Sequence, residues 1–386
     1  MLILVINCGS SSAKYELFDV EKESSLCRGI VERIGENSSM LTHEAAGKGR
    51  IQEEVPCPDH QRAIEIIKDT LVDADRGVLS DVNEVAGVGH RVVHGGEEFN
   101  ESTLIDDRVL ASVEKFSELA PLHNPPSLEG IRSCVKIFHG VPQVAVFDTA
   151  FHQSMPEYVF CYGIPYEFYE KYRIRKYGFH GTSHRYVSAM AAELMGKPLK
   201  DISVITVHLG NGCSIAAISG GKSIDTSMGF TPLEGLLMGT RSGDLDPAVV
   251  TFLMEKEGLS GGQVNSLLNK KSGLLGVSGI SNDMRDILKA VDEGNSRAKL
   301  AYDIFVYRIK KYIGSYAAVL GEVDAVVFTA GIGEHVPRIK DDIEKQLRLL
   351  LGDGTKFFVI RTNEELLIAK DAYGVVKEKE KAQRRR

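Results

Sequence analysis

Two short segments rich in glycine and small polar residues have the composition of phosphate-binding loops. The first is residues 7–14 (NCGSSSAK) and the second is residues 208–212 (HLGNG). Glycine lets the backbone turn tightly, so that successive N–H groups and serine hydroxyls can surround an anion, and Lys14 adds a positive charge. An ordinary hairpin turn explains the first segment alone equally well. Neither segment has the G-x-x-x-x-G-K-[ST] pattern of a Walker A loop.

Two arginines occur in glycine-rich surroundings that suit phosphoryl chemistry. Arg91 belongs to HRVVHGG and Arg241 to GTRSGD. A guanidinium group is a planar fork of donors that matches phosphoryl oxygens. Each arginine alone is better explained as a surface ion pair, but their shared setting favours a role in neutralising a transferring phosphoryl group.

The histidines occur in groups whose spacing does not suit a metal. His123 lies in LHNPP, His152 in DTAFH, and His180 and His184 in GFHGTSH. This spacing matches neither H-E-x-x-H nor a cysteine–histidine cluster, so a zinc site is disfavoured. Histidines that donate hydrogen bonds to developing charge need no such spacing.

Two carboxylates suggest a magnesium site. Asp148 follows the apolar run 144–147, and Glu364 begins the last predicted helix, where favourable placement near a helix N-terminus is the alternative explanation. Mg²⁺ prefers one or two carboxylates together with phosphate oxygens and water, which fits so sparse a set.

A third glycine-rich segment, residues 329–334 (TAGIGE), follows an apolar strand at residues 323–328. Such a turn suits an adenine or ribose. A nicotinamide dehydrogenase is disfavoured because the G-x-G-x-x-G pattern is absent.

These residues stand at the ends of predicted strands and helices, and their mixture predicts an α/β fold. Strands are predicted at residues 2–6, 14–20, 85–93, 143–147, 203–208, 214–218 and 323–328. Helices are predicted at residues 60–72, 107–119, 127–138, 183–195, 247–256 and 296–320. Asp106 or Asp107 and Ser183 are predicted N-caps. The charged tail 377–386 is predicted to be frayed.

The first two glycine segments have similar surroundings. Residues 3–10 (ILVINCGS) align with residues 205–212 (ITVHLGNG), and an apolar strand follows each at residues 15–18 and 215–218. This similarity predicts a duplicated domain, although coincidence explains it equally well because strand–turn–strand units are common.

Composition limits the class of protein. The 386 residues suffice for two or three domains, and 43% hydrophobic with 26% charged residues is typical of globular proteins. A net charge of −7 argues weakly against nucleic-acid binding. No apolar run is long enough for a bilayer, residues 1–8 read as a strand rather than a signal peptide, and the six cysteines form no C-x-x-C pair. We therefore expect a cytoplasmic protein with reduced cysteines and no membrane partner.

The motifs together resemble the acetokinase family of acetate, propionate and butyrate kinases. In order they are VINCGSSSAKY, GHRVVHGG, APLHNPP, VAVFDTAFHQ, RKYGFHGTSH, HLGNGCS, DTSMGFTPLEGLLMGTRSGDLDP, SNDMRD, FTAGIGE and TNEEL. The resemblance implies the duplicated actin-like fold of sugar kinases and Hsp70 ATPases, with two domains around a central cleft. The first domain would comprise residues 1–149 and 363–386 and the second residues 150–362. It also implies the reaction ATP + acetate ⇌ ADP + acetyl phosphate, dependence on Mg²⁺ (with Mn²⁺ as a substitute), and a homodimer.

The resemblance also implies roles for individual residues. The metal ligands are Asn7, Asp148 and Glu364. The catalytic residues are Arg91, Asp148, Arg241, His180 and the supporting His123. The acyl group is bound by Arg91, Val93, Leu122, Phe179 and Pro232. The nucleotide is bound by Ser12, Lys14, His208, Leu209, Gly210, Asn211, Gly212, Asp283, Met284, Arg285, Gly331, Ile332, Gly333, Glu334 and His335.

Two features depart from the family pattern. Residues 335–362 form a shorter segment than usual, and His335 replaces the asparagine that ends the familiar GIGEN motif. A displaced Glu364 would weaken metal binding. The alternatives that remain are a propionate or butyrate kinase and, from another class, a non-metabolic actin-like ATPase, because a fold does not determine a function.

Overall fold

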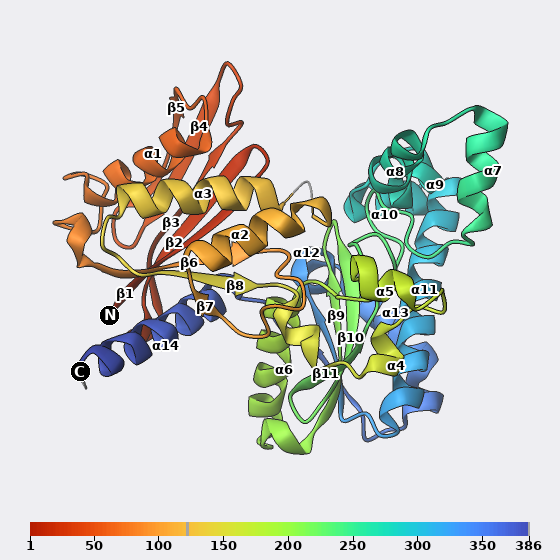
Figure 1. Cartoon of the computed structure of the whole chain (residues 1–386). Helices are drawn as coiled ribbons and strands as arrows, with labels where there is room; N and C mark the ends of the chain where they lie inside the picture. Colours follow the sequence, from red (N-terminus) through yellow and green to blue (C-terminus); the bar gives the residue numbers. More distant parts are fainter. Residues whose placement is uncertain (121–122, 385–386) are drawn as a thin grey trace. The chain divides into compact units, whose positions relative to one another are not determined.

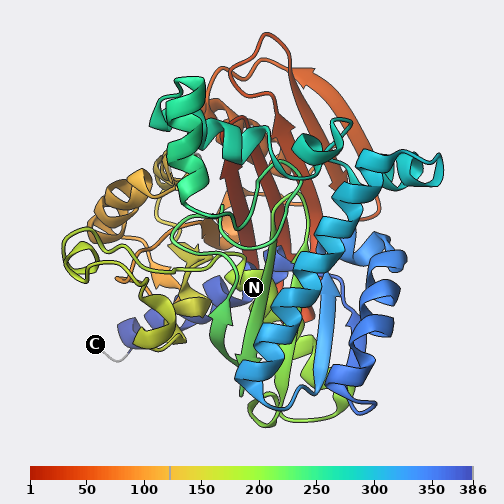
Figure 2. The ribbon, with the colours of Figure 1, turned by 90° about the vertical axis from the view of Figure 1, so that its right-hand side faces the viewer.

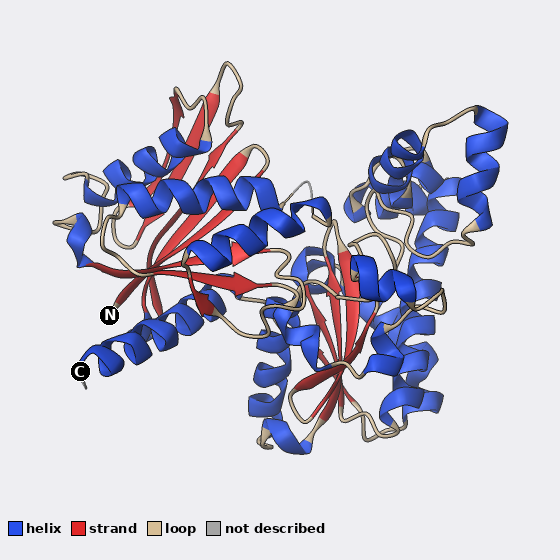
Figure 3. Ribbon diagram, in the orientation of Figure 1, coloured by secondary structure: helices blue, strands red, loops and turns tan. Residues whose placement is uncertain are grey.

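The computed structural model describes residues 1–120 and 123–384 (Figure 1). The chain forms two compact units. Unit 1 comprises Met1–Phe151 and Asn363–Arg386, and unit 2 comprises His152–Thr362. Each unit is a sheet flanked by helices (Figure 3), which confirms the predicted α/β class.

Unit 1 contains an eight-stranded mixed sheet in the order β5-β4-β3-β2-β1-β6-β8-β7. Its strands are β1 (Leu2–Gly9), β2 (Ser12–Asp19), β3 (Ser24–Glu32), β4 (Ser39–Ala45), β5 (Gly49–Val55), β6 (Val85–Val92), β7 (Thr103–Leu104) and β8 (Gln143–Phe147). The first five form an antiparallel meander, whereas β6 and β8 run parallel to β1. The sheet therefore combines a hairpin-built half with a crossover-built half.

Helices cover both faces of this sheet. They are α1 (His60–Val72), α2 (Asp107–Lys115), α3 (Asn124–Ile137) and α14 (Glu364–Arg384). Helices α1 and α3 pack over one face, and α14 packs on β1, β6 and β8. Two glycines of β6 permit this approach: a Cβ at Gly87 would stand 2.9 Å from Val376 Cγ2, and one at Gly89 would stand 2.8 Å from Ile368 Cγ2. Larger residues at these positions would push α14 away.

Unit 2 contains a five-stranded sheet in the order β11-β10-β9-β12-β13. Its strands are β9 (Ser203–Leu209), β10 (Cys213–Ser219), β11 (Lys222–Thr226), β12 (Ala325–Thr329) and β13 (Lys356–Val359). Its helices are α4 (Glu157–Phe160), α5 (Glu167–Tyr172), α6 (Gly181–Met195), α7 (Ala248–Glu257), α8 (Gly261–Lys270), α9 (Gly273–Ser278), α10 (Met284–Asp292), α11 (Ser296–Leu320), α12 (Ala330–His335) and α13 (Pro337–Leu351). Helix α6 packs on β9 and β12, and the long α11 crosses β9 and β10 (Figure 2).

The two units share one sheet topology. In unit 1 the central order is β3-β2-β1-β6-β8, and in unit 2 it is β11-β10-β9-β12-β13. In both, three antiparallel strands are followed by two parallel ones. Strands β1 and β9 hold the same place, which confirms the predicted duplication.

Two local predictions are wrong. Helix α6 begins at Gly181, so Ser183 is not its N-cap; Ser183 is buried and its hydroxyl donates to Thr362 Oγ1 over 3.0 Å. The predicted frayed tail is helical up to Arg384, because Val376 anchors α14 on the sheet and lysines alternate with glutamates beyond it. Residues 385–386 lie outside the described residues. By contrast, the Asp106 carboxylate accepts from Val109 N at 2.9 Å and caps α2 as predicted.

Candidate active site

An arginine–aspartate pair lies at one edge of the unit 1 sheet, namely where the carboxyl ends of the parallel strands β6 and β8 meet. Arg91 is on β6, and Asp148 follows β8, which runs parallel beside it. Arg91 Nη2 donates to Asp148 Oδ2 over 2.6 Å and Arg91 Nε to Asp148 Oδ1 over 3.1 Å. Such bidentate contact fixes the orientation of the guanidinium group as well as its position. Because Asp148 is only 1% exposed, this pair is largely shielded from solvent.

Glu364 adds a second carboxylate to this pair. It is the first residue of α14, and its Oε2 lies 3.9 Å from Arg91 Nε. Burial alone would lower the pKa of Arg91, but the charges of Asp148 and Glu364 outweigh burial and hold that pKa above its ordinary value. The shortened segment 335–362 therefore leaves Glu364 within ion-pair distance of Arg91.

The strand register brings Asn7 to the same edge. Its neighbour Ile6 is paired with His90 on β6, so Asn7 is next to Arg91 across the strands. Asn7 also faces Lys14 across the β1–β2 hairpin. Only Ser10 and Ser11 lie outside these two strands, so the predicted loop 7–14 is mostly ladder, and its backbone groups largely bond between strands.

The donor set of this edge suits a magnesium ion. Carboxylate and amide oxygens are hard ligands of the kind Mg²⁺ takes, and the carboxylates of Asp148 and Glu364 both reach Arg91. No cluster of three His, Cys, Asp or Glu side chains with metal-binding geometry occurs in residues 1–120 and 123–384. The fit therefore rests on two carboxylates and Asn7, which leaves room for phosphate oxygens and water.

The remaining predicted residues of unit 1 are more dispersed. Val93 follows β6 and is buried, His123 precedes α3, and Ser12 and Lys14 lie on β2, with Lys14 exposed. Leu122 lies outside the described residues.

In unit 2 the hairpin between β9 and β10 forms a tight three-residue turn. Gly210 N donates to Gly212 O over 3.0 Å, and Asn211 O accepts from Gly239 N at 3.0 Å. A Cβ built on Gly212 would stand 3.3 Å from Arg241 Nη1 and 3.4 Å from His180 Cε1. The turn, Arg241 and His180 therefore converge, and glycine leaves the space between them open.

Arg241 has neutral partners. Its Nη1 donates to Pro232 O over 3.1 Å, and it forms no ion pair with any carboxylate in the part of the chain that the structure describes. Burial lowers the pKa of Arg241. A desolvated cation without a counter-charge is unfavourable, so an anion bound beside it would be stabilised.

Four histidine side chains contact one another next to the turn that Arg241 approaches: His152, His180, His184 and His208. The His180 ring stacks on His208 with centroids 4.2 Å apart. His180 Nδ1 lies 2.9 Å from Ser214 Oγ, and the same hydroxyl lies 2.7 Å from His184 Nε2. His184 and His152 are fully buried. His180 itself adopts a left-handed conformation (φ +56°), a strained geometry that is common at functional sites.

The buried histidines are uncharged near neutral pH. Burial lowers the pKa of His152 to about 4, and burial together with His152 and His208 holds the pKa of His184 well below its ordinary value. His184 belongs to the motif GFHGTSH, from which no role was predicted for it. The signal that was available is its place in the same motif as His180, although the two residues do not share a helix face because α6 begins at Gly181.

The predicted nucleotide residues 283–285 begin helix α10. Asp283 caps this helix by accepting from Arg285 N at 2.8 Å, and the Arg285 guanidinium also binds its carboxylate. Hydrogen bonds from Arg285 lower the pKa of Asp283 to about 2. Asn282 Nδ2 donates to Asn211 Oδ1 over 3.1 Å, which ties this segment to the β9–β10 turn. Met284 is buried.

The glycines of residues 331–333 lie in the short helix α12 and not in the predicted turn. Glu334 holds this helix in place, because its Oε1 accepts from Ala330 N at 2.9 Å and Thr362 N at 3.1 Å. A Cβ on Gly331 would meet nothing within 4 Å, and His335 is exposed. Gly331 is thus open to a ligand, whereas the Glu334 carboxylate is already engaged.

The remaining predicted residues of unit 2 are all partly or fully buried. They are His208, Leu209, Phe179, Pro232 and Ile332.

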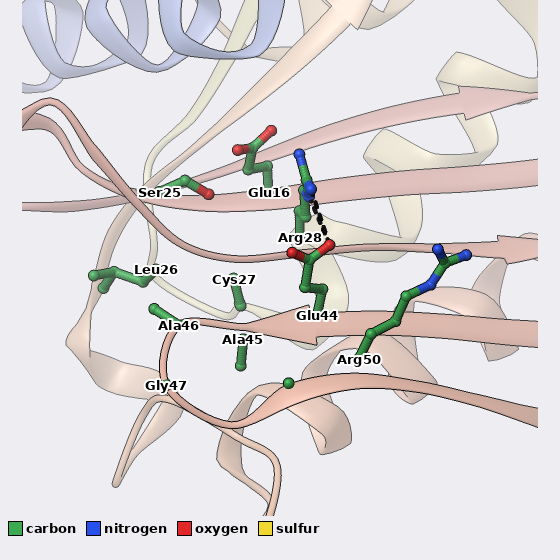
Figure 4. A pocket seen from close by; sticks show the side chains of 11 residues that line it. Glu16, Ser25, Leu26, Cys27, Arg28, Glu44, Ala45, Ala46, Gly47 and Arg50 are labelled. Atoms are coloured by element: carbon green, nitrogen blue, oxygen red, sulfur yellow. Dashed lines mark hydrogen bonds and ion pairs between the residues drawn. The ribbon is translucent and has the colours of Figure 1, made fainter.

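A separate pocket of about 470 Å³ lies on the meander of unit 1 (Figure 4). Arg28 on β3 and Glu44 on β4 form an ion pair across it, with Nη2 and Oε2 2.9 Å apart. None of the predicted site residues lines this pocket. The charges of Arg28 and Glu44 are paired with each other and exposed, so this ion pair offers no cradle for an anion.

The comparisons with known proteins agree with one another. The model of the acetokinase family matches residues 2–356. A curated acetate kinase from Halothermothrix orenii is 56% identical over 97% of this chain and 100% of its own length. The crystal structure of Porphyromonas gingivalis acetate kinase has a TM-score of 0.92 and 45% identity, and that of a propionate kinase from Francisella tularensis has 0.91 and 43%; each comparison covers 97% of this chain and 99% of the other. In the described residues no helix is long and apolar enough to span a membrane.

Proposed function

The chain belongs to the acetokinase family, and from that premise we propose that it is an acetate kinase. It transfers the γ-phosphoryl group of ATP to acetate, giving ADP and acetyl phosphate, in a reversible reaction. An acetate oxygen attacks the γ-phosphorus in line while the bond to the β–γ bridging oxygen breaks, and its electron pair leaves with ADP. No phosphoenzyme is required.

The observation that carries this proposal is the environment of Arg241. Its guanidinium is desolvated, has no carboxylate partner in the described residues, and lies beside Gly212 and His180. During transfer a phosphoryl group spreads negative charge over three oxygens. This negative charge would compensate the positive charge of the Arg241 guanidinium.

Two further groups of residues in unit 2 bind the nucleotide. The turn 210–212, which follows His208 and Leu209, supplies the backbone N–H groups of Asn211 and Gly212 to the phosphates. Residues 283–285 and 331–335 form the adenosine pocket, with Gly331 allowing close approach. This assignment is supported by the hydrogen bond between Asn282 and Asn211.

The polar edge of unit 1 acts on the phosphoryl group and its metal. Asp148, Glu364 and Asn7 would hold Mg²⁺ (or Mn²⁺), which would supply positive charge to neutralise phosphate charge. Asp148 also orients Arg91 by the bidentate contact, so that Arg91 presents its remaining donors in a fixed direction. His123, Ser12 and Lys14 support this edge.

The reaction needs no general base. Acetate is ionised at neutral pH because carboxylic acids have pKa values of about 4. The neutral buried histidines His152 and His184 are consistent with this, since neither is required to carry a proton during transfer.

Apolar residues set the acyl preference. We expect the side chains of Val93, Phe179 and Pro232 to set this preference, together with Leu122, which lies outside the described residues. One methylene in an apolar pocket changes binding by roughly 1–3 kcal/mol, so discrimination among short carboxylates is graded. A propionate kinase is the second candidate, favoured by the 43% identity and TM-score of 0.91 to the Francisella tularensis propionate kinase.

The assembly and location are further parts of the proposal. We expect a cytoplasmic homodimer, an expectation that rests on membership of the family. Unit 2 exposes five large apolar side chains in residues 157–172, which suit a self-association surface: Tyr158, Ile164, Tyr166, Phe168 and Tyr172. Light scattering of the purified protein measures the oligomeric state directly.

The deciding experiment is a hydroxamate assay for acyl phosphate with ATP and Mg²⁺. Acetate, propionate and butyrate are compared by kcat/KM, and acetate is expected to rank first. A higher value for propionate would replace acetate kinase by propionate kinase. Release of inorganic phosphate without any hydroxamate would support the non-metabolic ATPase instead.

A further inference from the structure

A long irregular loop in unit 2 carries two of the proposed site residues. Residues 227–247, between β11 and α7, contain no helix or strand and include Pro232 and Arg241. Loops of this length without regular structure are uncommon in compact domains and are usually functional. Their side chains need anchors, because the backbone ladder that holds a strand is missing.

Tyr162 anchors the first part of the loop. Its hydroxyl donates to a carboxylate oxygen of Glu234 and accepts from Phe230 N at 2.8 Å. Pro232 lies midway between these two contacts. A Cβ at Gly229 would stand 1.7 Å from Glu234 Oε2 and 2.2 Å from the Tyr162 hydroxyl, so glycine there is a condition of this contact.

The Glu234 carboxylate is largely desolvated. Burial raises its pKa, the Tyr162 hydrogen bond and Lys176 oppose that rise, and Asp244 and Asp225 reinforce it. The hydrogen bond from Tyr162 is therefore directed at a group that has lost most of its water, where such bonds are strong.

Tyr312 anchors the second part of the loop. Its hydroxyl donates to Asp244 Oδ2 over 2.7 Å. Asp244 Oδ1 in turn accepts from Gly235 N at 2.8 Å, and Asp244 N donates to Gly235 O over 2.9 Å. These contacts close the base of residues 235–244, which carry Arg241.

We infer that Tyr162 and Glu234 are positioning residues that hold Pro232 against the acyl acceptor, whereas Tyr312 and Asp244 position Arg241. The inference rests on the proposed function and divides the loop into two arms with separate duties. The arms meet at one hydrogen bond, from Arg241 Nη1 to Pro232 O. Each anchor thus acts mainly, but not wholly, on its own arm.

Two matched hydroxyl deletions test this division. Tyr162→Phe removes both hydrogen bonds of the first anchor, and KM for acetate is expected to rise about tenfold, with kcat within about threefold and KM for ATP within about twofold of wild type. Tyr312→Phe is expected to do the reverse, lowering kcat about tenfold with KM for acetate within about twofold. The ratio of kcat/KM for acetate to kcat/KM for propionate is expected to fall in Tyr162→Phe and to stay unchanged in Tyr312→Phe.

The control for generic damage is Tyr302→Phe. Tyr302 donates to Asp342 Oδ2 over 2.6 Å and links α11 to α13 in the same unit. Both kinetic constants are expected to stay at wild-type values. The Glu234→Gln variant keeps an oxygen acceptor for Tyr162, so its KM for acetate should stay close to the wild-type value. The Glu234→Ala variant has no such acceptor, and its KM for acetate should rise.

The outcomes are distinct. If Tyr162→Phe keeps a wild-type KM for acetate, or Tyr302→Phe raises it equally, the division is overturned while the proposed function stands. If the wild-type protein forms no hydroxamate with any carboxylate, the proposed function fails and this role fails with it. If Tyr162→Phe does not fold, as judged by its thermal transition, the Glu234→Gln and Glu234→Ala pair decides by the same measure.

Discussion

The two units use the same sheet topology but give opposite charge to the edge where their proposed site residues lie. In unit 1, Arg91 is outnumbered by the carboxylates of Asp148 and Glu364. In unit 2, Arg241 has a carbonyl and a sulfur as partners, and the histidines nearby are hydrogen-bonded to hydroxyls. One edge therefore suits a cation and the other an anion. Topology determines where a site lies, whereas its side chains determine the sign of what it binds.

The largest effect is expected when the cation of unit 2, Arg241, is removed. Arg241→Ala is expected to lower kcat by about 10³-fold, because it deletes a charge that faces the developing negative charge, while KM for ATP changes much less. Acyl phosphate formation measures this effect. Arg338→Ala is the control, since Arg338 is exposed and paired with Asp292 over 3.0 Å. Near-normal turnover in Arg241→Ala would break the contrast.

The next test asks whether the cation of unit 1 depends on its carboxylates. Asp148→Asn leaves Arg91 with one distant counter-charge and removes a buried partner, so the free energy of unfolding should fall by about 3 kcal/mol. Urea unfolding measures it. Asp225→Asn, which breaks a pair with Lys176 over 3.0 Å in unit 2, should cost less because both groups are more exposed than Asp148. Equal losses would show that the two pairs are alike.

A smaller effect is expected from the outer carboxylate. Glu364→Gln should raise the Mg²⁺ concentration for half-maximal activity by at least about tenfold, with little change in stability because Asp148 still holds Arg91. Calorimetric titration with Mg²⁺ and ATP provides a second measure. Glu365→Gln, one residue along α14, should move both quantities less. A Glu364→Gln enzyme with unchanged Mg²⁺ dependence would remove Glu364 from the proposed metal site.

The last test concerns acid stability, in which the units should behave alike. Burial lowers the pKa of His90 in unit 1 and of His152 in unit 2 from 6.5 to about 4. In this pH range the unfolded chain binds protons at these histidines and the folded chain does not. The free energy of unfolding therefore decreases as pH falls from about 6.5 to about 4. Each histidine should contribute a slope of about 1 kcal/mol per pH unit.

Variants at these histidines test that equality. His90→Gln and His152→Gln should each flatten the pH dependence of the unfolding free energy between pH 6.5 and 4 by the same amount. Replacing His139, which is exposed, should leave the dependence unchanged. A flattening in only one variant would sharpen the contrast by assigning acid sensitivity to one unit.

Sequence predicted the buried elements well. Residues 60–72, 143–147 and 296–320 were predicted with the observed bounds, because continuous apolar runs and a 3.6-residue period are strong local signals. Strands β3, β4 and β5 were missed. The sequence of β5 (GRIQEEV) shows why: an edge strand in contact with solvent carries no apolar run.

The candidate site was predictable as residue types and not as contacts. Arg91 and Asp148 are 57 residues apart in sequence, and only the parallel register of β6 with β8 brings them together. The bond from Ser183 to Thr362 likewise joins residues 179 apart. No local pattern encodes such pairings. The ordered motifs supplied the candidates, and the sheet supplied their geometry.

The return of α14 to unit 1 has a consequence for synthesis of the chain. Unit 1 begins with β1 but is closed by residues made after all of unit 2, since α14 covers β1, β6 and β8. During translation the apolar face around Gly87 and Gly89 is not covered by α14 until unit 2, which can fold by itself, has been synthesised. A premature stop near residue 363 would therefore release a finished unit 2 attached to an open, aggregation-prone sheet. It would also lack Glu364, so maturation of the polypeptide and completion of the proposed metal site are a single event.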